Sequence, residues 1–342
     1  MKGLILCAGR GRGLRPLTLK RAKAAVMLAN KPILYYCIRK LLEANIREIG
    51  IVIGPQGDDI REVVESYFPD LNPVFITQQR PDGIAAAIMA AEKFLCREPF
   101  LLLLGDNIFE ENLTALTERY NPASGDALIM VSYVENPEKF GVVVFDGERV
   151  DKVVEKPKVL VSNWAITGAY IFGPAIFLAI SNIVPSRRGE LEITDAIQWL
   201  VANGKNVVIV KTDKWWLDTG SPENLLKANR YLLETLCPTV SLGKDCMITN
   251  CQLIPPLIIG DRCILSNSTV GPYVTIGSDS KLTDVRTDNS LFMDHVFLSN
   301  IKHVISNSII GSHTTISNLD VSGDLKLLLG DYSSMRHGSG HY

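Results

Sequence analysis

The sequence of 342 residues has no long hydrophobic run, no C-x-x-C pair and almost no excess of one charge. No window approaches the roughly 18 apolar residues that a membrane helix needs, so we expect no membrane partner. The seven cysteines are scattered and odd in number, which indicates neither a disulfide framework nor a zinc site and suits a reducing cytoplasm. A net charge of −2 gives no reason to expect nucleic acid as a partner.

The two common phosphate-binding loops are absent as well. The Walker pattern G-x-x-x-x-G-K-[ST] does not occur, and the glycines at positions 9, 11 and 13 lack the G-x-G-x-x-G spacing of a dinucleotide site. Residues 4–16 nevertheless pass from an apolar run into glycines and arginines, which predicts a buried strand followed by a tight loop. Backbone N–H groups in such a loop bind anions, and Arg10, Arg12, Arg15 and Lys23 add positive charge. We favour a phosphate-binding loop; the alternative is a glycine-rich hairpin with solvated arginines.

Strands and helices alternate over the first part of the chain. Strands are predicted at 48–54, 74–76 and 100–104, and helices at 32–44, 58–67 and 84–94. This alternation predicts a Rossmann-like α/β fold with a mostly parallel, doubly wound sheet. Ligands bind beyond the carboxyl ends of the strands in such sheets, so the N-terminal loop and Asp106 should face one cleft.

From about residue 126 the strands become more frequent. Strands are predicted at 127–134, 141–145, 150–154, 166–172 and 207–210, and helices at 192–202 and 221–236. Ser221 followed by Pro222 is typical of the start of a helix. We assign residues 1–236 to one domain, because the pattern breaks at Cys237-Pro238.

Beyond this break, aliphatic residues recur every six positions. They are Ile258, Ile264, Val270, Ile276 and Leu282, and in a second phase Phe292, Leu298, Val304, Ile310 and Ile316. A six-residue period suits neither a helix nor a plain strand, and it predicts a parallel β-helix with one aliphatic residue of each strand pointing inward. We place this domain at 237–331, with 323–329 as its cap, and expect 332–342 to be a disordered tail. The alternative is an irregular linker rich in Ser and Asn.

A few charged residues have the chemistry of a phosphate-transfer site. Asp106, in Leu-Leu-Gly-Asp-Asn, and Asp218, in Trp-Leu-Asp-Thr-Gly, offer carboxylates of the kind that hold Mg²⁺ together with substrate phosphates. Taken singly, each aspartate is more often a cap or turn residue. Lys156 follows a strand beside Glu155, and we interpret the pair as holding a sugar phosphate and accepting sugar hydroxyls; the alternative is a surface ion pair.

Several short motifs follow one another in the order of a known family. The N-terminal segment matches it at Leu6, Ala8, Gly9, Gly11, Leu14, Pro16, Leu17, Thr18, Lys23, Lys31 and Pro32. Further matches are Gly105-Asp106-Asn107, Phe140-Gly141, Glu155-Lys156-Pro157, the run from Gly189 to Asp195 and the run from Trp216 to Gly220. The chain thus resembles the sugar-1-phosphate nucleotidylyltransferases over nearly its whole length. Within them it is similar to the long-form glucose-1-phosphate thymidylyltransferases, which carry a C-terminal left-handed β-helix.

The resemblance implies an activity and a set of site residues. The activity is Mg²⁺-dependent transfer of a nucleotidyl group from dTTP or UTP to glucose-1-phosphate, with release of pyrophosphate. The implied nucleotide-binding residues are Leu6, Ala8, Gly9, Gly11, Gln78 and Gly83, with Gln78 pairing with the edge of thymine or uracil. The implied sugar-phosphate-binding residues are Asn107, Gly141, Glu155, Lys156 and Tyr170. The implied catalytic residues are Lys23, Arg12, Arg15, Asp106, Lys156 and Asp218, of which Asp106 and Asp218 bind Mg²⁺.

One position departs from the family pattern. Gly13 occupies the place of the catalytic arginine, and Arg12 or Arg15 would have to supply the missing charge. If neither does, the chain is a weakly active enzyme or a non-catalytic nucleotide-sugar-binding regulatory homologue. A second activity, acyl transfer on the β-helix, would have to use His295, His303 or His313. Because β-helices often pack side by side, we also expect a homo-oligomer.

Overall fold

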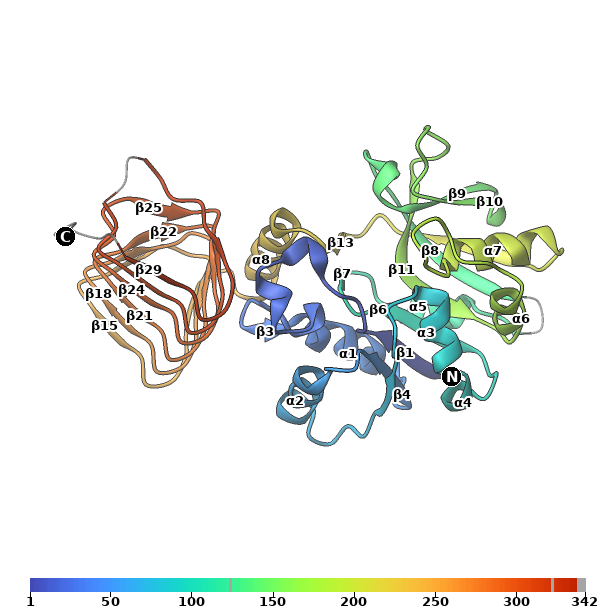
Figure 1. Ribbon diagram of the computed structural model, residues 1–342, viewed down its shortest axis with the longest axis horizontal. Coiled ribbons are helices and arrows are strands. Elements are labelled where there is room, and N and C mark those ends of the chain that lie inside the picture. Colours follow the sequence, from blue (N-terminus) through green and yellow to red (C-terminus); the bar gives the residue numbers. More distant parts are fainter. Residues whose placement is uncertain (123–124, 321–322, 337–342) are drawn as a thin grey trace. The chain divides into compact units, whose positions relative to one another are not determined.

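The computed structural model describes residues 1–122, 125–320 and 323–336, and the chain divides into two compact units. The first unit contains Met1–Arg10 and Ile33–Asp218, and the second contains Gly11–Pro32 and Thr219–Tyr342. Figure 1 shows a sheet with helices in the first unit and a stack of coils in the second. Each unit has a hydrophobic core of its own.

The first unit is built on a nine-stranded sheet in the order β5-β4-β1-β6-β11-β8-β12-β10-β9. Its strands are β1 (Lys2–Leu6), β4 (Ile49–Ile53), β5 (Val74–Thr77), β6 (Phe100–Leu104), β8 (Ala127–Tyr133), β9 (Gly141–Asp146), β10 (Arg149–Glu155), β11 (Trp164–Phe172) and β12 (Val207–Lys211). Strands β5, β4, β1 and β6 are parallel, whereas β11 runs antiparallel to both β6 and β8. The predicted α/β fold is confirmed, and its continuous parallel part is formed by the N-terminal strands.

The helices of the first unit are α1 (Ile33–Glu43), α2 (Asp58–Tyr67), α3 (Ile84–Ala90), α4 (Glu92–Leu95), α5 (Thr114–Arg119), α6 (Ala175–Ser181) and α7 (Ile193–Ala202). In α1, the buried residues Leu34, Ile38 and Leu41 recur at helical spacing, which explains why the pattern predicts this helix. The single helix predicted at 84–94 is divided at Ala91 into α3 and α4. Helices α5 and α6 have six and seven residues, too few for the sequence pattern to reveal a period. No helix in the described ranges is long and apolar enough to cross a bilayer.

The core of the first unit lies against the middle of the sheet. Buried side chains of β6, β8 and β11 meet those of α3, α6 and α7. The ring of Phe100 lies 5.9 Å from the ring of Phe172 and 6.2 Å from that of Phe177, and all three are fully buried or nearly so. This packing fixes β6, the strand whose carboxyl end leads into Asp106.

The second unit combines α8 (Pro222–Leu236), the segment Gly11–Pro32 and a left-handed parallel β-helix. Ser221 caps α8 as predicted, because its hydroxyl accepts a hydrogen bond of 3.2 Å from the N–H of Asn224. We call Gly11–Pro32 the strap. It contains β2 (Met27–Leu28), β3 (Lys31–Pro32) and the 3-10 turns η1 (Arg12–Leu14), η2 (Leu17–Leu19) and η3 (Lys23–Ala25).

Three sheets of short parallel strands form the walls of the β-helix. The first wall contains β14 (Val240–Leu242), β17 (Leu257–Ile259), β20 (Val274–Ile276), β23 (Leu291–Phe292), β26 (Ile309–Ile310) and β28 (Leu328–Leu329). The second contains β15 (Met247–Thr249), β18 (Ile264–Ser266), β21 (Lys281–Thr283), β24 (Phe297–Ser299), β27 (Thr315–Ser317) and β29 (Ser334–Arg336). The third contains β16 (Gln252–Leu253), β19 (Thr269–Val270), β22 (Arg286–Asp288) and β25 (Val304–Ser306).

The predicted interior of the β-helix is correct at most positions and displaced by one residue at three. Val270, Leu282 and Ile316 are buried as expected. The three displaced positions are Ile258, Ile264 and Val304, which are only half-buried, whereas their neighbours Leu257, Leu265 and Ile305 are buried. Corner residues on successive coils lie 17 or 18 positions apart, so a coil of 17 falls one short of three six-residue repeats. A shift of one residue moves a strand side chain to the opposite face.

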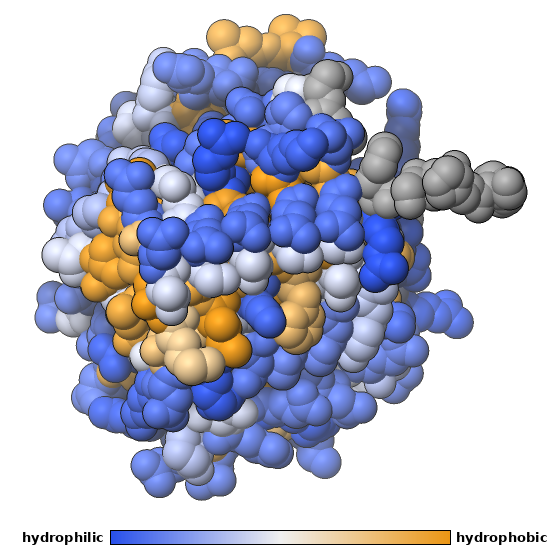
Figure 2. Space-filling view, turned by 90° about the vertical axis from the view of Figure 1, so that its left-hand side faces the viewer, coloured by the Kyte–Doolittle hydropathy of each residue, from blue (hydrophilic) through white to orange (hydrophobic). Residues whose placement is uncertain are grey.

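The corners of the β-helix explain its content of asparagine. Asn250, Asn267, Asn300 and Asn318 all have φ between 50° and 56°, a left-handed conformation that Asn adopts more readily than most residues. Their side chains bond from coil to coil, from Asn250 to Asn267 at 2.8 Å and from Asn300 to Asn318 at 3.0 Å. Figure 2 shows hydrophilic side chains aligned in rows on the surface of the β-helix. The asparagines are therefore part of a regular β-helix, and the alternative of an irregular linker is wrong.

The compact units do not follow the boundary predicted at residues 236 and 237. The strap and α8 belong with the β-helix, because the N–H of Ala29 and the hydroxyl of Thr275 both donate to Asn229 Oδ1, at 2.9 and 2.8 Å. The predicted cap and tail also need correction. Strands β28 and β29 extend two walls of the β-helix through Arg336, so regular structure continues into the predicted tail. Its last residues, 337–342, lie outside the described part of the chain.

The observed inward position in β18 predicts different stability losses when two adjacent residues, Ile264 and Leu265, are truncated. Leu265→Ala should destabilise the β-helix more than Ile264→Ala, because Leu265 is fully buried and its truncation leaves a cavity that costs about 2–5 kcal/mol. Thermal unfolding of both variants, followed by circular dichroism, measures the difference. An equal loss of thermal stability in the two variants, or a greater loss in Ile264→Ala, would contradict the assignment of Leu265 to the interior.

Candidate active site

The carboxyl ends of β1 and β6 lie side by side and carry the first of the predicted site residues. Leu6 pairs with Leu104 in register, and the N–H of Gly105 donates to the carbonyl of Leu6 at 3.0 Å. A Cβ at Gly105 would lie 2.6 Å from the sulfur of Cys7, so glycine is required for this close approach. The glycine-rich loop and Asp106 therefore leave the sheet at neighbouring strand ends.

A two-stranded ladder brings Asp218 to the same place. Strand β7 (Asn107–Phe109) pairs antiparallel with β13 (Trp216–Asp218), and Asp218 stands opposite Asn107. Asn107 is only 3% exposed; its Nδ2 donates to Asp106 Oδ1 at 2.8 Å, and its Oδ1 accepts from Trp216 Nε1 at 2.7 Å. Asn107 thereby holds the Asp106 carboxylate, while the indole of Trp216 holds Asn107.

A pocket of about 150 Å³ lies beside this ladder. The predicted residues that line it are Asn107, Gly141, Glu155, Lys156, Tyr170 and Asp218. Other polar or flanking residues that line it are Lys139, Phe140, Thr167, Gly168, Thr194 and Trp216. The pocket is small and is lined by two ammonium groups, two carboxylates, an amide and hydroxyls. This lining suits a ligand that carries both a phosphate and hydroxyl groups.

Glu155 is held in place by partners that the sequence did not reveal. Arg188 NH2 donates to Glu155 Oε1 at 3.0 Å, and the Thr194 hydroxyl donates to Glu155 Oε2 at 3.2 Å. The same guanidinium donates to Glu192 Oε1 at 2.8 Å and 3.2 Å. Lys156 Nζ lies 3.6 Å from Glu155 Oε1, so the ion pair considered as the alternative is present, as part of a larger network. The only sequence signal for Arg188 is its position directly before the Gly189 to Asp195 motif.

Lys156 and Tyr170 are fixed in different ways. Lys156 has φ of 41°, a left-handed conformation that is costly for a lysine and is frequent at binding sites, and its N–H donates to the Phe140 carbonyl at 3.0 Å. Tyr170 is 3% exposed, and burial raises the pKa of its phenol, so the hydroxyl keeps its proton at neutral pH. The pocket thus contains the Lys156 ammonium group on a constrained backbone and the protonated phenol of Tyr170.

Gln78 has a side chain whose orientation is set by its neighbours. Its Nε2 donates to Asp82 Oδ1 at 2.9 Å and to the Gly83 carbonyl at 3.2 Å. Both amide protons are engaged, so Oε1 is the group that can accept a further hydrogen bond. Gly83 has φ of 112°, and a Cβ there would lie 2.3 Å from the carbonyl oxygen of Leu191, so glycine is needed at this position.

The donor set at Asp106 and Asp218 fits a hard divalent cation. Mg²⁺ takes oxygen ligands and uses one or two protein carboxylates with waters and substrate phosphates. Within residues 1–122, 125–320 and 323–336, no group of three or more His, Cys, Asp or Glu side chains could hold a metal by itself. Burial and, to a smaller extent, the charge of Asp106 raise the pKa of the neighbouring Cys37 thiol to about 12.

The remaining predicted residues, Gly11, Arg12, Arg15 and Lys23, lie in the strap and therefore in the second unit. Gly11 has φ of 56°, and its carbonyl accepts a hydrogen bond of 2.6 Å from the Thr18 hydroxyl. Arg12 and Arg15 are exposed, and Lys23 is half-buried. The predicted site residues are thus distributed over both units, with the division between Arg10 and Gly11.

Gly13 has a structural reason to be glycine. A Cβ at this position would lie 2.3 Å from the carbonyl oxygen of Gly220, far inside contact distance. Because the obstacle is backbone, no side-chain rotation can relieve it. The arginine that the family pattern places here would not fit this backbone arrangement.

The histidines considered for a second activity take part in a ladder of stacked rings. The ring of His295 stacks on that of His313 at 4.5 Å, and His313 stacks on Tyr332 at 4.8 Å. His295, His313 and Tyr332 all have left-handed backbone conformations, like the corner asparagines. This arrangement gives two of the three histidines a structural role in the β-helix.

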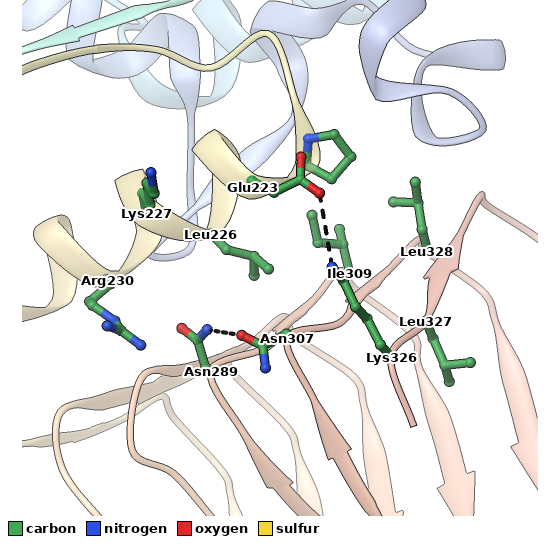
Figure 3. Close-up of a pocket in the computed structure, with 11 residues that line it drawn as sticks. Glu223, Leu226, Lys227, Arg230, Asn289, Asn307, Ile309, Lys326, Leu327 and Leu328 are labelled. Carbon is green, nitrogen blue, oxygen red and sulfur yellow. Dashed lines mark hydrogen bonds and ion pairs between the residues drawn. The ribbon is translucent and has the colours of Figure 1, made fainter. Parts of the chain in front are cut away.

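A larger pocket, of about 470 Å³, lies between α8 and the β-helix, and none of the predicted site residues lines it (Figure 3). Two of its cations, Lys326 and Arg230, have partners within the protein. Lys326 Nζ lies 3.9 Å from Glu223 Oε1, and the guanidinium of Arg230 lies 4.4 Å from the ring centroid of Tyr273. Leu226, Leu327 and Leu328 give it an apolar part. The pocket is explained by the packing of α8 along the corners of the coils.

The described fold and site correspond to a known family. The nucleotidyl transferase family matches residues 2–235 of the chain. The chain belongs to the nucleotidyl transferase family. Members of this family are enzymes, and the predicted resemblance is confirmed.

Two relatives and one solved structure illustrate the match. The glucose-1-phosphate thymidylyltransferase of Streptomyces griseus is 34% identical, over 97% of this chain and 98% of the relative. The low-salt glycan biosynthesis nucleotidyltransferase Agl11 of Haloferax volcanii is 40% identical, over 68% of this chain and 66% of the relative. A crystal structure assigned as a glucose-1-phosphate thymidylyltransferase of Bacillus anthracis is 31% identical, with a TM-score of 0.62, over 68% of this chain and 94% of that protein. The Streptomyces relative spans the β-helix as well as the sheet.

The contact between Gly13 and Gly220 makes a prediction about stability. Gly13→Ala should lower the free energy of unfolding by about 1–3 kcal/mol, because the new Cβ forces the backbone apart. Gly9→Ala is the matched control: its Cβ would meet nothing within 4 Å, so we expect a change within about 0.5 kcal/mol. Urea denaturation measures both. Equal stability of the Gly13 variant and the wild type would show that the backbone around Gly220 can accommodate a Cβ at this position.

Proposed function

We propose that this nucleotidyltransferase transfers the nucleotidyl group of dTTP or UTP to glucose-1-phosphate and releases pyrophosphate. The observation that carries the proposal is the β7–β13 pairing, which sets Asp218 opposite Asn107 and beside the pocket lined by Glu155 and Lys156. The sugar-phosphate oxygen attacks the α-phosphorus in line, and the pyrophosphate leaves on the opposite side. Such a transfer depends on positioning and charge neutralisation rather than on a covalent intermediate.

On the sugar side, the pocket residues bind and orient the acceptor. Lys156 neutralises the phosphate of the sugar, and Glu155, held by Arg188 and Thr194, accepts hydrogen bonds from sugar hydroxyls. Asn107 and Tyr170 supply further polar contacts, and Gly141 leaves room for the ring, since a Cβ there would approach Glu155 Oε2 to 3.2 Å. The acceptor oxygen is thereby presented in one orientation, which lowers the entropic part of the barrier.

On the nucleotide side, we propose that backbone groups of Leu6, Ala8, Gly9 and Gly11 hold the triphosphate. Lys23, Arg12 and Arg15 neutralise its charge, and the two arginines take the place of the one that Gly13 excludes. Asp106 and Asp218 would hold Mg²⁺, which screens the phosphate oxygens and stabilises the charge that develops on them. Asn107 keeps the Asp106 carboxylate in the orientation needed for this role.

The base is read by Gln78. Its Nε2 donates within the protein, which leaves Oε1 to accept a hydrogen bond from the base. Thymine and uracil both offer the N3–H donor, whereas cytosine presents an acceptor at that atom. Gly83 allows the base to approach. A methyl group is all that separates thymine from uracil, so a pocket can distinguish them by only about 1–3 kcal/mol.

The alternative function is that of a weakly active or non-catalytic homologue that binds nucleotide-sugars. The observation behind it is again Gly13, which removes one cation from the loop. It predicts binding of nucleotide and sugar phosphate without measurable turnover. We also propose that the protein forms a homo-oligomer.

The experiment is a panel of dTTP, UTP, CTP and ATP against several sugar-1-phosphates with Mg²⁺, with pyrophosphate release as the readout. We expect dTTP and UTP to be used with glucose-1-phosphate, within about 10–200-fold of each other, and CTP and ATP far less. Omission of Mg²⁺ should abolish turnover. Binding without pyrophosphate release for every pair would support the non-catalytic alternative, and preference for CTP or ATP would refute the role of Gln78.

A further inference from the structure

The strap is fastened to the last coil of the β-helix by a partly buried ion pair. Arg21 NH2 lies 3.0 Å from Asp331 Oδ2 and 3.0 Å from the hydroxyl oxygen of Ser312. The Asp331 side chain is only 9% exposed and that of Arg21 20%. Asp331 Oδ1 accepts the N–H of Ser312 at 2.8 Å, so both carboxylate oxygens are engaged. Removing one member of such a pair leaves the other as an uncompensated, partly buried charge.

Two further contacts lie on either side of this pair. The ammonium group of Lys20 lies 5.0 Å from the centroid of the Tyr332 ring, the last ring of the stacked ladder. Gly330 packs so closely against the strap that a Cβ would lie 2.9 Å from the Pro16 carbonyl oxygen. Residues 330–332 of the β-helix therefore contact the strap through three successive positions.

The other end of the strap is anchored separately. Asn30 Nδ2 donates to the carbonyl of Ile276 at 2.8 Å, and the N–H of Ala29 donates to Asn229 Oδ1 at 2.9 Å. Asn229 lies on α8 and is 1% exposed, and Thr275 of the β-helix donates to the same oxygen. Lys23 lies between the two anchors, two residues from Arg21.

We propose that Arg21 and Asp331 are positioning residues for nucleotide binding, and that the last coil of the β-helix thereby serves the transfer reaction. This inference rests on the proposed function, because it assumes that Arg12, Arg15 and Lys23 bind the triphosphate. These cations are carried by a segment whose regular structure consists of three short 3-10 turns and a two-stranded ladder, and contacts with the last coil and with α8 hold it at both ends. Binding by a preorganised segment avoids the entropic cost of ordering it.

The test compares Asp331→Asn with the wild type in steady-state pyrophosphate release. The variant keeps the shape of the side chain and removes its charge. We expect the KM for the nucleoside triphosphate to rise by about 10- to 100-fold, or kcat to fall by a similar factor. The KM for glucose-1-phosphate should stay within about twofold, because its proposed residues lie in the first unit. A loss of general stability would not produce this selective effect.

Two further variants separate positioning from folding. Asp279→Asn is the matched control: Asp279 forms an ion pair of 2.6 Å with Arg262 at corners of the same β-helix, where no contact with the strap occurs, and its kinetics should equal those of the wild type. The exchanged pair Arg21→Asp with Asp331→Arg should recover part of the affinity that each single change loses. Hydrogen exchange of residues 11–32 should be faster in Asp331→Asn than in the control.

The outcomes distinguish this inference from the proposed function. Wild-type turnover with an unchanged nucleotide KM in Asp331→Asn would overturn the inference alone. An equal rise of both KM values, or an equal effect of Asp279→Asn, would also overturn it, because the effect would then be structural. A wild-type protein that neither turns over nor binds dTTP would overturn the proposed function, and this inference with it.

Discussion

The antiparallel pairing of β7 with β13 is the contact on which the candidate active site depends. Asp106 reaches the site because it follows β6, whereas Asp218 comes from a distant part of the chain and is placed opposite Asn107 by this ladder. The Asn107 side chain, bonded to Asp106 and to the Trp216 indole, locks the two strands and the carboxylate together. The ladder thus connects the two carboxylates that we propose as ligands of a divalent cation.

The predicted site residues fall in both compact units. The pocket proposed to bind the sugar phosphate, with Glu155, Lys156 and Tyr170, lies wholly in the first unit. The cations proposed for the triphosphate lie on the strap, which is fastened to the β-helix and to α8. The β-helix is thus more than a C-terminal addition, because it shares a network of hydrogen bonds with the segment predicted to bind the nucleotide. A substitution far along the chain, at Asp331, can be expected to affect the chemistry at residues 11–23.

Much of the fold could be predicted from the sequence, because local patterns determine it. Helix α2 and strand β6 have the predicted bounds, since hydrophobic periodicity and flanking glycines depend only on neighbouring residues. The site network could not be predicted in the same way. Arg188 lies 33 residues from Glu155, and the contact of Gly13 with Gly220 joins opposite ends of the first 220 residues. Such contacts follow from the way the elements pack, which a single sequence does not reveal.

The β-helix shows where pattern reasoning loses accuracy. The six-residue period identified the architecture but assigned Ile264 to the interior in place of Leu265. In β18 (Ile264–Ser266) the only buried position is the central one, Leu265, so a shift of one residue in a coil exchanges the inward and outward assignments. The roles proposed for the site residues are predictions of a different kind, since they rest on the family resemblance and on the grouping of side chains.

The central claim is that Asp106 and Asp218 hold one divalent cation together. Titration with Mn²⁺ in the presence of dTTP, followed by electron paramagnetic resonance, tests it most directly. The account predicts one ion for each chain. Asp106→Asn and Asp218→Asn should each weaken its binding by about tenfold or more, the double variant should bind little more weakly than either, and the exposed Asp151→Asn should bind like the wild type. Wild-type affinity in either single variant, or fully additive losses in the double variant, would show that the two carboxylates do not share a metal ion.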